Sequence, residues 1–108
     1  MWLFTKVGFF SVVQHRDHDD TLLVRARDAD DLKALKKRYM PTLGAIQQKD
    51  AADYPYRAAI GRNDFAAGME HIALDIDYMN FKRLIARNDP MRARAYTAVW
   101  AVMLSINR

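Results

Sequence analysis

The sequence predicts an α+β fold in which an antiparallel sheet carries helices packed on one face, and the arrangement expected first is ferredoxin-like. Three observations lead to this class. Two β-forming segments, 3–15 and 21–27, follow each other with only a short polar connection. Helical periodicity fills most of the chain after residue 28, interrupted by one further β-forming segment at 53–60. Adjacent strands followed by helices are typical of two-layer α+β proteins.

Size and composition indicate one folded domain spanning 1–108. Of the 108 residues, 51% are hydrophobic and 28% are charged, which is a globular rather than a disordered composition. Lys and Arg exceed Asp and Glu by 17 to 13, giving a net charge of +4. This modest excess permits an acidic partner such as nucleic acid without requiring one.

The absence of cysteine removes several classes of function. Without Cys, the sequence supports no disulfide framework, thiolate metal site or thiol nucleophile, and it indicates no cofactor. No apolar run reaches the ~20 residues of a membrane helix. Lys6 interrupts the apolar start of the chain early, which argues against a leader peptide. We therefore expect a cytoplasmic protein with no membrane partner.

The run from Leu3 to about His15 predicts the first strand, because aromatic and β-branched residues dominate it. Gly8 within it indicates a bulge or a close approach of another backbone. The Asp-rich segment 15–20 predicts a turn into the second strand at 21–27, and so an antiparallel hairpin. Alternation of sides along the first strand groups Trp2, Phe4, Lys6 and Phe10 on one face.

The remaining elements follow from capping and periodicity. Residues 28–39 predict a helix capped by Asp28 and ended by Pro41. Segment 42–52 is expected to be mainly loop, with a further strand available at 46–49. Pro55 places the strand at 53–60 at a sheet edge or at its own start.

The second half of the chain predicts three helices. Gly61 ends the preceding strand, and Asn63 or Asp64 is expected to cap a helix that reaches about Ile76. A short helix covers about 81–85. The last helix runs from Pro90, with Asp89 as its cap, to about residue 106.

Three segments together resemble a family of small uncharacterised bacterial proteins. They are Trp2–Lys6 with Gly8–Ser11 (W-L-F-T-K and G-F-F-S), Asp53–Arg57 (D-Y-P-Y-R), and Ile76–Tyr78 with Asn80–Lys82 (I-D-Y and N-F-K). A helix with Val99, Trp100 and Met103 follows them. The resemblance covers nearly the whole chain and implies a single short bacterial domain. It implies no activity.

The first candidate site is a basic and aromatic face of the sheet. If Lys6 shares a face with Arg25, Arg27 and Arg57, then Trp2, Phe4 and Phe10 lie among these cations. Guanidinium groups neutralise phosphates and aromatic rings stack on unpaired bases, so nucleic acid is one partner that fits. The alternative is that the last helix or a second copy of the chain covers this face, and that its rings belong to a core.

The second candidate is a polar pocket formed by segments 54–57 and 77–82. Both segments combine tyrosine with a cation at the boundary of an element, as ligand clefts often do. The residues concerned are Tyr54, Tyr56, Arg57, Asp77, Tyr78, Asn80 and Lys82. The structural alternative is that Asp77 or Asn80 caps a helix and that the tyrosine hydroxyls lie at the edge of the core.

Two further patterns carry less information. His15 and His18, with neighbouring carboxylates, do not have the spacing of a known ligand pattern, so no metal site is predicted. On the last helix, an apolar stripe indicates either core packing or contact with a second copy. The stripe consists of Tyr96, Trp100, Met103 and Leu104.

These observations favour a binding or interaction module without enzymatic activity, working as a homodimer. It would contact an anionic partner through the surface around Lys6, Arg25, Arg27 and Arg57. The alternative is a small-ligand-binding protein or an enzyme, with its pocket between 54–57 and 77–82. A purely structural subunit is the third reading, and no catalytic residue is predicted.

Overall fold

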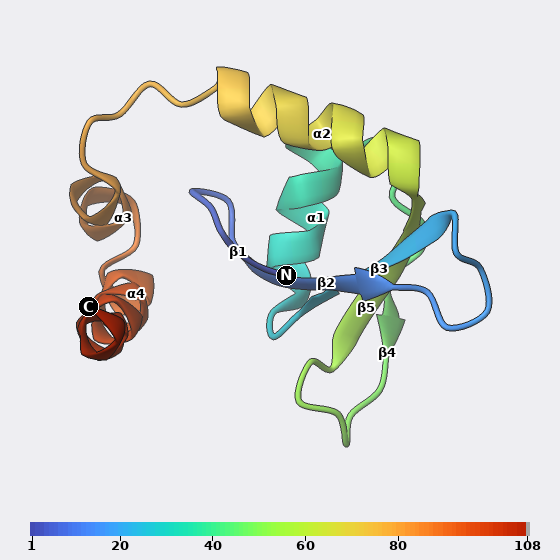
Figure 1. The fold of residues 1–108 in the computed structure, drawn as a ribbon, viewed down its shortest axis with the longest axis horizontal. Coiled ribbons are helices and arrows are strands. Elements are labelled where there is room, and N and C mark those ends of the chain that lie inside the picture. Colours follow the sequence, from blue (N-terminus) through green and yellow to red (C-terminus); the bar gives the residue numbers. More distant parts are fainter. Residues whose placement is uncertain (108) are drawn as a thin grey trace. The chain divides into compact units, whose positions relative to one another are not determined.

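The computed structural model describes residues 1–107, which divide into two compact units at residue 77 (Figure 1). Residues 1–76 contain a five-stranded antiparallel sheet and two helices, and residues 77–107 contain two further α-helices. The predicted α+β class with an antiparallel sheet is therefore confirmed. That the chain forms one domain stays a prediction, and each unit is described by itself.

Every neighbouring pair of strands in the sheet is antiparallel. The spatial order is β1-β2-β3-β5-β4, and β4 supplies the further strand expected near 46–49. A ferredoxin-like fold has a helix between its first two strands, whereas a short turn joins β1 and β2 here, so the ferredoxin-like arrangement is not confirmed. The strands are β1 (Trp2–Phe4), β2 (Phe9–Gln14), β3 (Thr21–Ala26), β4 (Gln47–Gln48) and β5 (Tyr56–Gly61).

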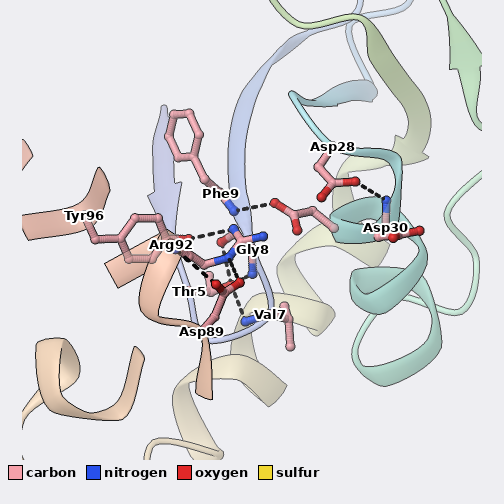
Figure 2. A network of polar contacts seen from close by, with 10 residues as sticks. Thr5, Val7, Gly8, Phe9, Asp28, Asp30, Asp89, Arg92 and Tyr96 are labelled. Carbon is pink, nitrogen blue, oxygen red and sulfur yellow. Dashed lines mark hydrogen bonds and ion pairs between the residues drawn. The ribbon is translucent and has the colours of Figure 1, made fainter. Parts of the chain in front are cut away.

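The single strand predicted at 3–15 is wrong, because the segment turns back on itself between Phe4 and Phe9. Thr5 closes this turn: its hydroxyl donates to the Gly8 carbonyl at 2.9 Å and accepts the N–H groups of Val7 and Gly8 at 3.2 and 3.1 Å (Figure 2). Apolar, β-forming residues lie on both sides of the turn, so alternation alone did not reveal it. Gly8 is required there because a Cβ would lie 2.5 Å from the Cγ of Asp31.

Two helices pack on the sheet of the first unit: α1 (Ala29–Arg38) and α2 (Arg62–Leu74). Asp28 caps α1 as predicted, accepting the N–H of Asp30 at 2.9 Å (Figure 2). The predicted cap of the next helix is wrong. Helix α2 follows β5 directly with Gly61 as its N-cap, and Asp64 accepts the Thr42 hydroxyl at 3.1 Å instead.

Both helices cover the same face of the sheet, and a single hydrophobic core lies between the two layers (Figure 1). Leu32 and Leu35 supply the buried stripe of α1, and Phe65 that of α2. The buried side chains of the strands are Phe10, Val12, Leu22, Val24, Ala26, Ala58 and Ile60. The opposite face of the sheet has no helix of residues 1–76 on it.

The second unit is a helical hairpin of α3 (Phe81–Asn88) and α4 (Pro90–Met103), which continues as a 3-10 turn, η1 (Leu104–Ile106). Asn80 caps α3 and Asp89 caps α4, each through its side-chain oxygen. The rings of Phe81 and Tyr96 stack 5.7 Å apart between the helices. Arg92 reaches both Asp89 and the Tyr96 hydroxyl, at 3.4 and 3.2 Å (Figure 2). None of the described helices is long and apolar enough to cross a membrane.

Candidate functional site: an arginine face on the sheet

A row of cross-strand partner residues, one from each of the five strands, lies on the side of the sheet away from α1 and α2. In order, the partners are Trp2, Ser11, Arg25, Arg57 and Gln47. Each of these residues is next in sequence to a residue whose side chain packs in or against the core. Because successive side chains of a strand alternate between the two faces, the row lies on the face away from the core. We define the arginine face as Trp2, Phe4, Phe9, Ser11, Arg25, Tyr54 and Arg57.

The two central arginines are held by neutral groups. Arg25 donates from Nη2 to the Ser11 hydroxyl at 2.7 Å, and Arg57 donates from Nη2 to the Tyr54 carbonyl at 3.1 Å. The Nε atoms of both side chains are buried and have no hydrogen-bond partner within residues 1–107. Neither guanidinium forms an ion pair with a described carboxylate.

The pairing of Arg25 with Arg57 carries an energetic cost. Arg25 and Arg57 are direct cross-strand partners, and like charges placed opposite each other destabilise a sheet. Their buried Nε donors add the cost of unmade hydrogen bonds. An oxyanion bound between the guanidinium groups would offset the like-charge repulsion.

Aromatic rings surround the arginines. The Tyr54 ring lies under two guanidinium groups, with the Cζ of Arg25 at 4.9 Å and that of Arg27 at 4.8 Å from its centroid. Phe9 stacks on Phe4 at 4.6 Å and lies 6.2 Å from Tyr54. Trp2 contacts the edge of this cluster and is 66% exposed, so it presents a large ring to solvent.

The structure brings Arg25 and Arg57 together with Trp2 and Phe4 on this face, but not Lys6 or Phe10. Tyr54, which the sequence assigns to the pocket, also contacts this face. Because the turn at 5–8 reverses the chain, Phe9 of β2 joins Trp2 and Phe4, while Phe10 is fully buried in the core. Tyr56 also packs against the core. Phe9 and Ser11 were missed, and only the position of the turn would have revealed them.

Lys6 forms an ion pair with Asp75 at the end of α2. Its ammonium lies 3.2 Å from the Asp75 carboxylate and donates to the Asp75 carbonyl at 3.0 Å. The same carboxylate accepts the Tyr39 hydroxyl and, at 3.0 Å, the Arg38 guanidinium. The hydrogen bonds of Tyr39 and Lys6, with the charges of Lys6 and Arg38, outweigh partial desolvation and lower the pKa of Asp75 below its ordinary value. This cluster ties the turn, α1 and α2 together, which is a structural role.

The second predicted site divides between the two units. In the first unit, Tyr54 and Arg57 belong to the arginine face. In the second, Asn80 is a helix cap and the Lys82 ammonium lies 3.6 Å from the centroid of the Trp100 ring. A pocket of 360 Å³ opens beside the start of α3. Its lining is Asp77, Tyr78, Met79, Asn80, Arg83, Leu84 and Arg87.

The histidines show no ligand site. The rings of His15 and His18 lie 5.1 Å apart, and His15 Nδ1 accepts the Asp17 N–H at 3.1 Å. Within residues 1–107, no group of three or more His, Asp or Glu side chains is placed to hold a metal ion.

Comparison of this chain with family models, with curated proteins and with solved structures finds no match. The resemblance to small bacterial proteins therefore stays a prediction, and the function has to be argued from the site.

Proposed function

We propose that the protein is a non-enzymatic binding module that holds an anionic partner on its arginine face. The observation that carries this proposal is the pair Arg25 and Arg57, opposite each other on β3 and β5 with neutral partners and no described carboxylate. Guanidinium groups fit the oxygens of phosphate or carboxylate. The Arg27 guanidinium also lies over the Tyr54 ring and adds a third cation at the edge.

The test compares two double variants that change the net charge equally. Arg25→Gln with Arg57→Gln removes the central pair, and Lys33→Gln with Lys36→Gln removes two exposed cations of α1. The probe is a fluorescent single-stranded oligonucleotide, measured by anisotropy over a series of salt concentrations. Loss of two charge-assisted contacts is expected to weaken binding by at least about tenfold, and the lysine control is expected to change it much less.

The salt series identifies the kind of contact. Binding through phosphates should weaken steeply as salt rises, and the arginine variant should show a shallower slope. Equal losses in the two double variants, or affinity that does not depend on salt, would contradict the proposal. If only inorganic phosphate or a small carboxylate binds, the partner is a small anion rather than a nucleic acid.

The alternative, a small-ligand-binding protein or enzyme, is supported by the pocket beside α3. Its lining combines a carboxylate, a phenol and two guanidinium groups, a mixture suited to a polar ligand. Thermal shifts with a panel of small phosphates and carboxylates would test it, with Tyr78→Phe and Arg87→Gln as the variants. A shift that both variants abolish would favour the pocket over the arginine face. A cytoplasmic location, which stays a prediction, fits either function.

A further inference from the structure

The end of α4 exposes an unusual amount of apolar surface. Six large side chains between residues 99 and 106 are between 37% and 69% exposed. They lie within a stretch, 95–107, that contains no charged residue. Monomeric proteins seldom expose contiguous apolar patches beyond a few hundred Å². We call the following set the α4 patch: Val99, Trp100, Val102, Met103, Leu104 and Ile106.

Helix α3 does not cover this patch because it is too short. It has 8 residues against the 14 of α4, and the two helices join at Asp89, so α3 lies along the first part of α4. Its first turn reaches Tyr96 through Phe81 and the Trp100 ring through Lys82. The residues after Trp100 extend past the start of α3.

The patch also wraps around the helix. At about 100° per residue, Val102 and Trp100 point in directions roughly 160° apart. A helix that is apolar on all sides is usually buried on several sides, as in a bundle. A helix lying on a membrane surface needs one strongly polar face, which this segment lacks, and a spanning helix needs ~20 residues. Another protein surface is therefore the better fit.

We propose that the occupant is the α4 patch of a second copy of this chain, related by a two-fold axis. In such a pair the same patch meets itself, so its partner must be apolar and uncharged, as residues 95–107 are. An antiparallel crossing also keeps the cations of α4 apart, because Arg92 and Arg94 both lie in its first turns. Lys82 of α3, whose ammonium lies over the Trp100 ring, borders the patch.

The available area sets the strength of the contact. A large apolar side chain offers on the order of 100 Å² when fully exposed, so six half-exposed side chains contribute roughly 300 Å² per copy. With a polar rim this reaches only about 1,000 Å² in total, the lower end for a specific interface. The dimer is therefore expected to dissociate on dilution through the micromolar range.

The test is sedimentation velocity of the full chain over a dilution series. The wild type is expected to pass from twice the 12.5 kDa chain mass to the monomer mass as it is diluted. Val102→Glu places a charge in the patch at a side chain that is 69% exposed, so it should leave the monomer folded and shift dissociation to at least tenfold higher concentration. Met79→Glu is the matched control, since Met79 is fully exposed outside the patch and should change nothing.

Several outcomes would overturn the proposal. They are a monomer at every concentration, a dimer that Val102→Glu and Met79→Glu affect equally, and a monomer that floats with anionic lipid vesicles. Ile106→Glu is a second variant for the case in which Val102→Glu lowers the melting temperature. Retention of the dimer by a folded Ile106→Glu chain would likewise remove the patch from the interface.

Discussion

Asp75 is a single residue on which three segments of the first unit depend. Its carboxylate accepts Tyr39 from the end of α1, Arg38 from α1 itself and Lys6 from the β1–β2 turn. Lys6 also satisfies the Asp75 main-chain carbonyl at the end of α2, where the helix dipole favours a cation. The cluster therefore fixes the C-terminal end of α2 against its neighbours.

We predict that Asp75 makes the stability of the protein fall at low pH. Its pKa is lowered in the folded state relative to the ordinary value of 3.8, so the unfolded chain takes up a proton more readily than the folded chain. The stabilisation is present above the ordinary pKa of 3.8 and is lost as the pH falls through the folded-state pKa. Asp75→Asn should lower the melting temperature at pH 7 and flatten its decline below pH 4. Asp17→Asn, in the exposed turn, should keep the wild-type profile.

Gly68 is a second residue at which one added atom, a Cβ, is expected to change the stability of the fold. A Cβ there would lie 2.5 Å from Cγ and 2.8 Å from Cε of Met40, which is itself 1% exposed. Alanine improves helix propensity by about 1 kcal/mol over glycine, but overpacking a core costs about 1–3 kcal/mol. We expect Gly68→Ala to destabilise the protein, as measured by urea unfolding. Ala67→Gly reports the propensity term alone, and a stabilising Gly68→Ala would show that Met40 moves aside easily.

At the scale of elements, the β1–β2 turn decides which residues form the candidate site. The sequence groups Arg25 and Arg57 in one candidate face, and the two are cross-strand partners in the structure. It assigns Tyr54 only to the pocket. It fails for Lys6 and Phe10, since the run Trp2–Val13 gives no compositional sign that Thr5 to Gly8 reverse the chain. The hydrogen bonds of the Thr5 hydroxyl hold the turn that sets the register of β1 and β2. Hydrophobic periodicity along the sequence does not reveal such bonds.

We therefore predict that Thr5→Val destabilises the hairpin while Thr5→Ser preserves it. Valine keeps the shape of threonine but removes the oxygen that bonds the Val7 and Gly8 N–H groups and the Gly8 carbonyl. Thr5 is 5% exposed, so the two N–H groups lose their partner away from water, at about 1–3 kcal/mol. The Gly8 carbonyl keeps the Thr5 N–H at 3.0 Å. Chemical denaturation gives the difference, and amide exchange of Phe9 shows whether the loss is local. Equal stability of the two variants would contradict the role given to the hydroxyl.

Charge is unevenly distributed over the whole molecule. Residues 1–76 contain eleven Lys and Arg and eleven Asp and Glu, so the net charge of +4 falls entirely within 77–108. The arginine face is therefore a local concentration of cations on a neutral unit, and its affinity should depend on geometry. Long-range attraction of an anion is expected to come instead from the positive charge of residues 77–108. The overall composition gives only the net charge of the whole chain, so it does not show this difference between the two units.

The hydrophobic core is also confined to one unit, and this leads to a prediction about folding. Every residue of the core cluster, from Leu3 to Ile72, belongs to residues 1–76, and so do all five strands. We expect a chain of residues 1–76 to fold by itself, with dispersed amide resonances and cooperative thermal unfolding. Within residues 77–107 the buried apolar side chains are Ile85 and Tyr96, and isolated helices of 8 and 14 residues are marginal in water. A peptide of residues 77–108 should show little helix at low concentration, and more as concentration rises if the α4 patch pairs. An unfolded 1–76 chain would instead show that the units stabilise each other and that 1–108 is a single cooperative domain.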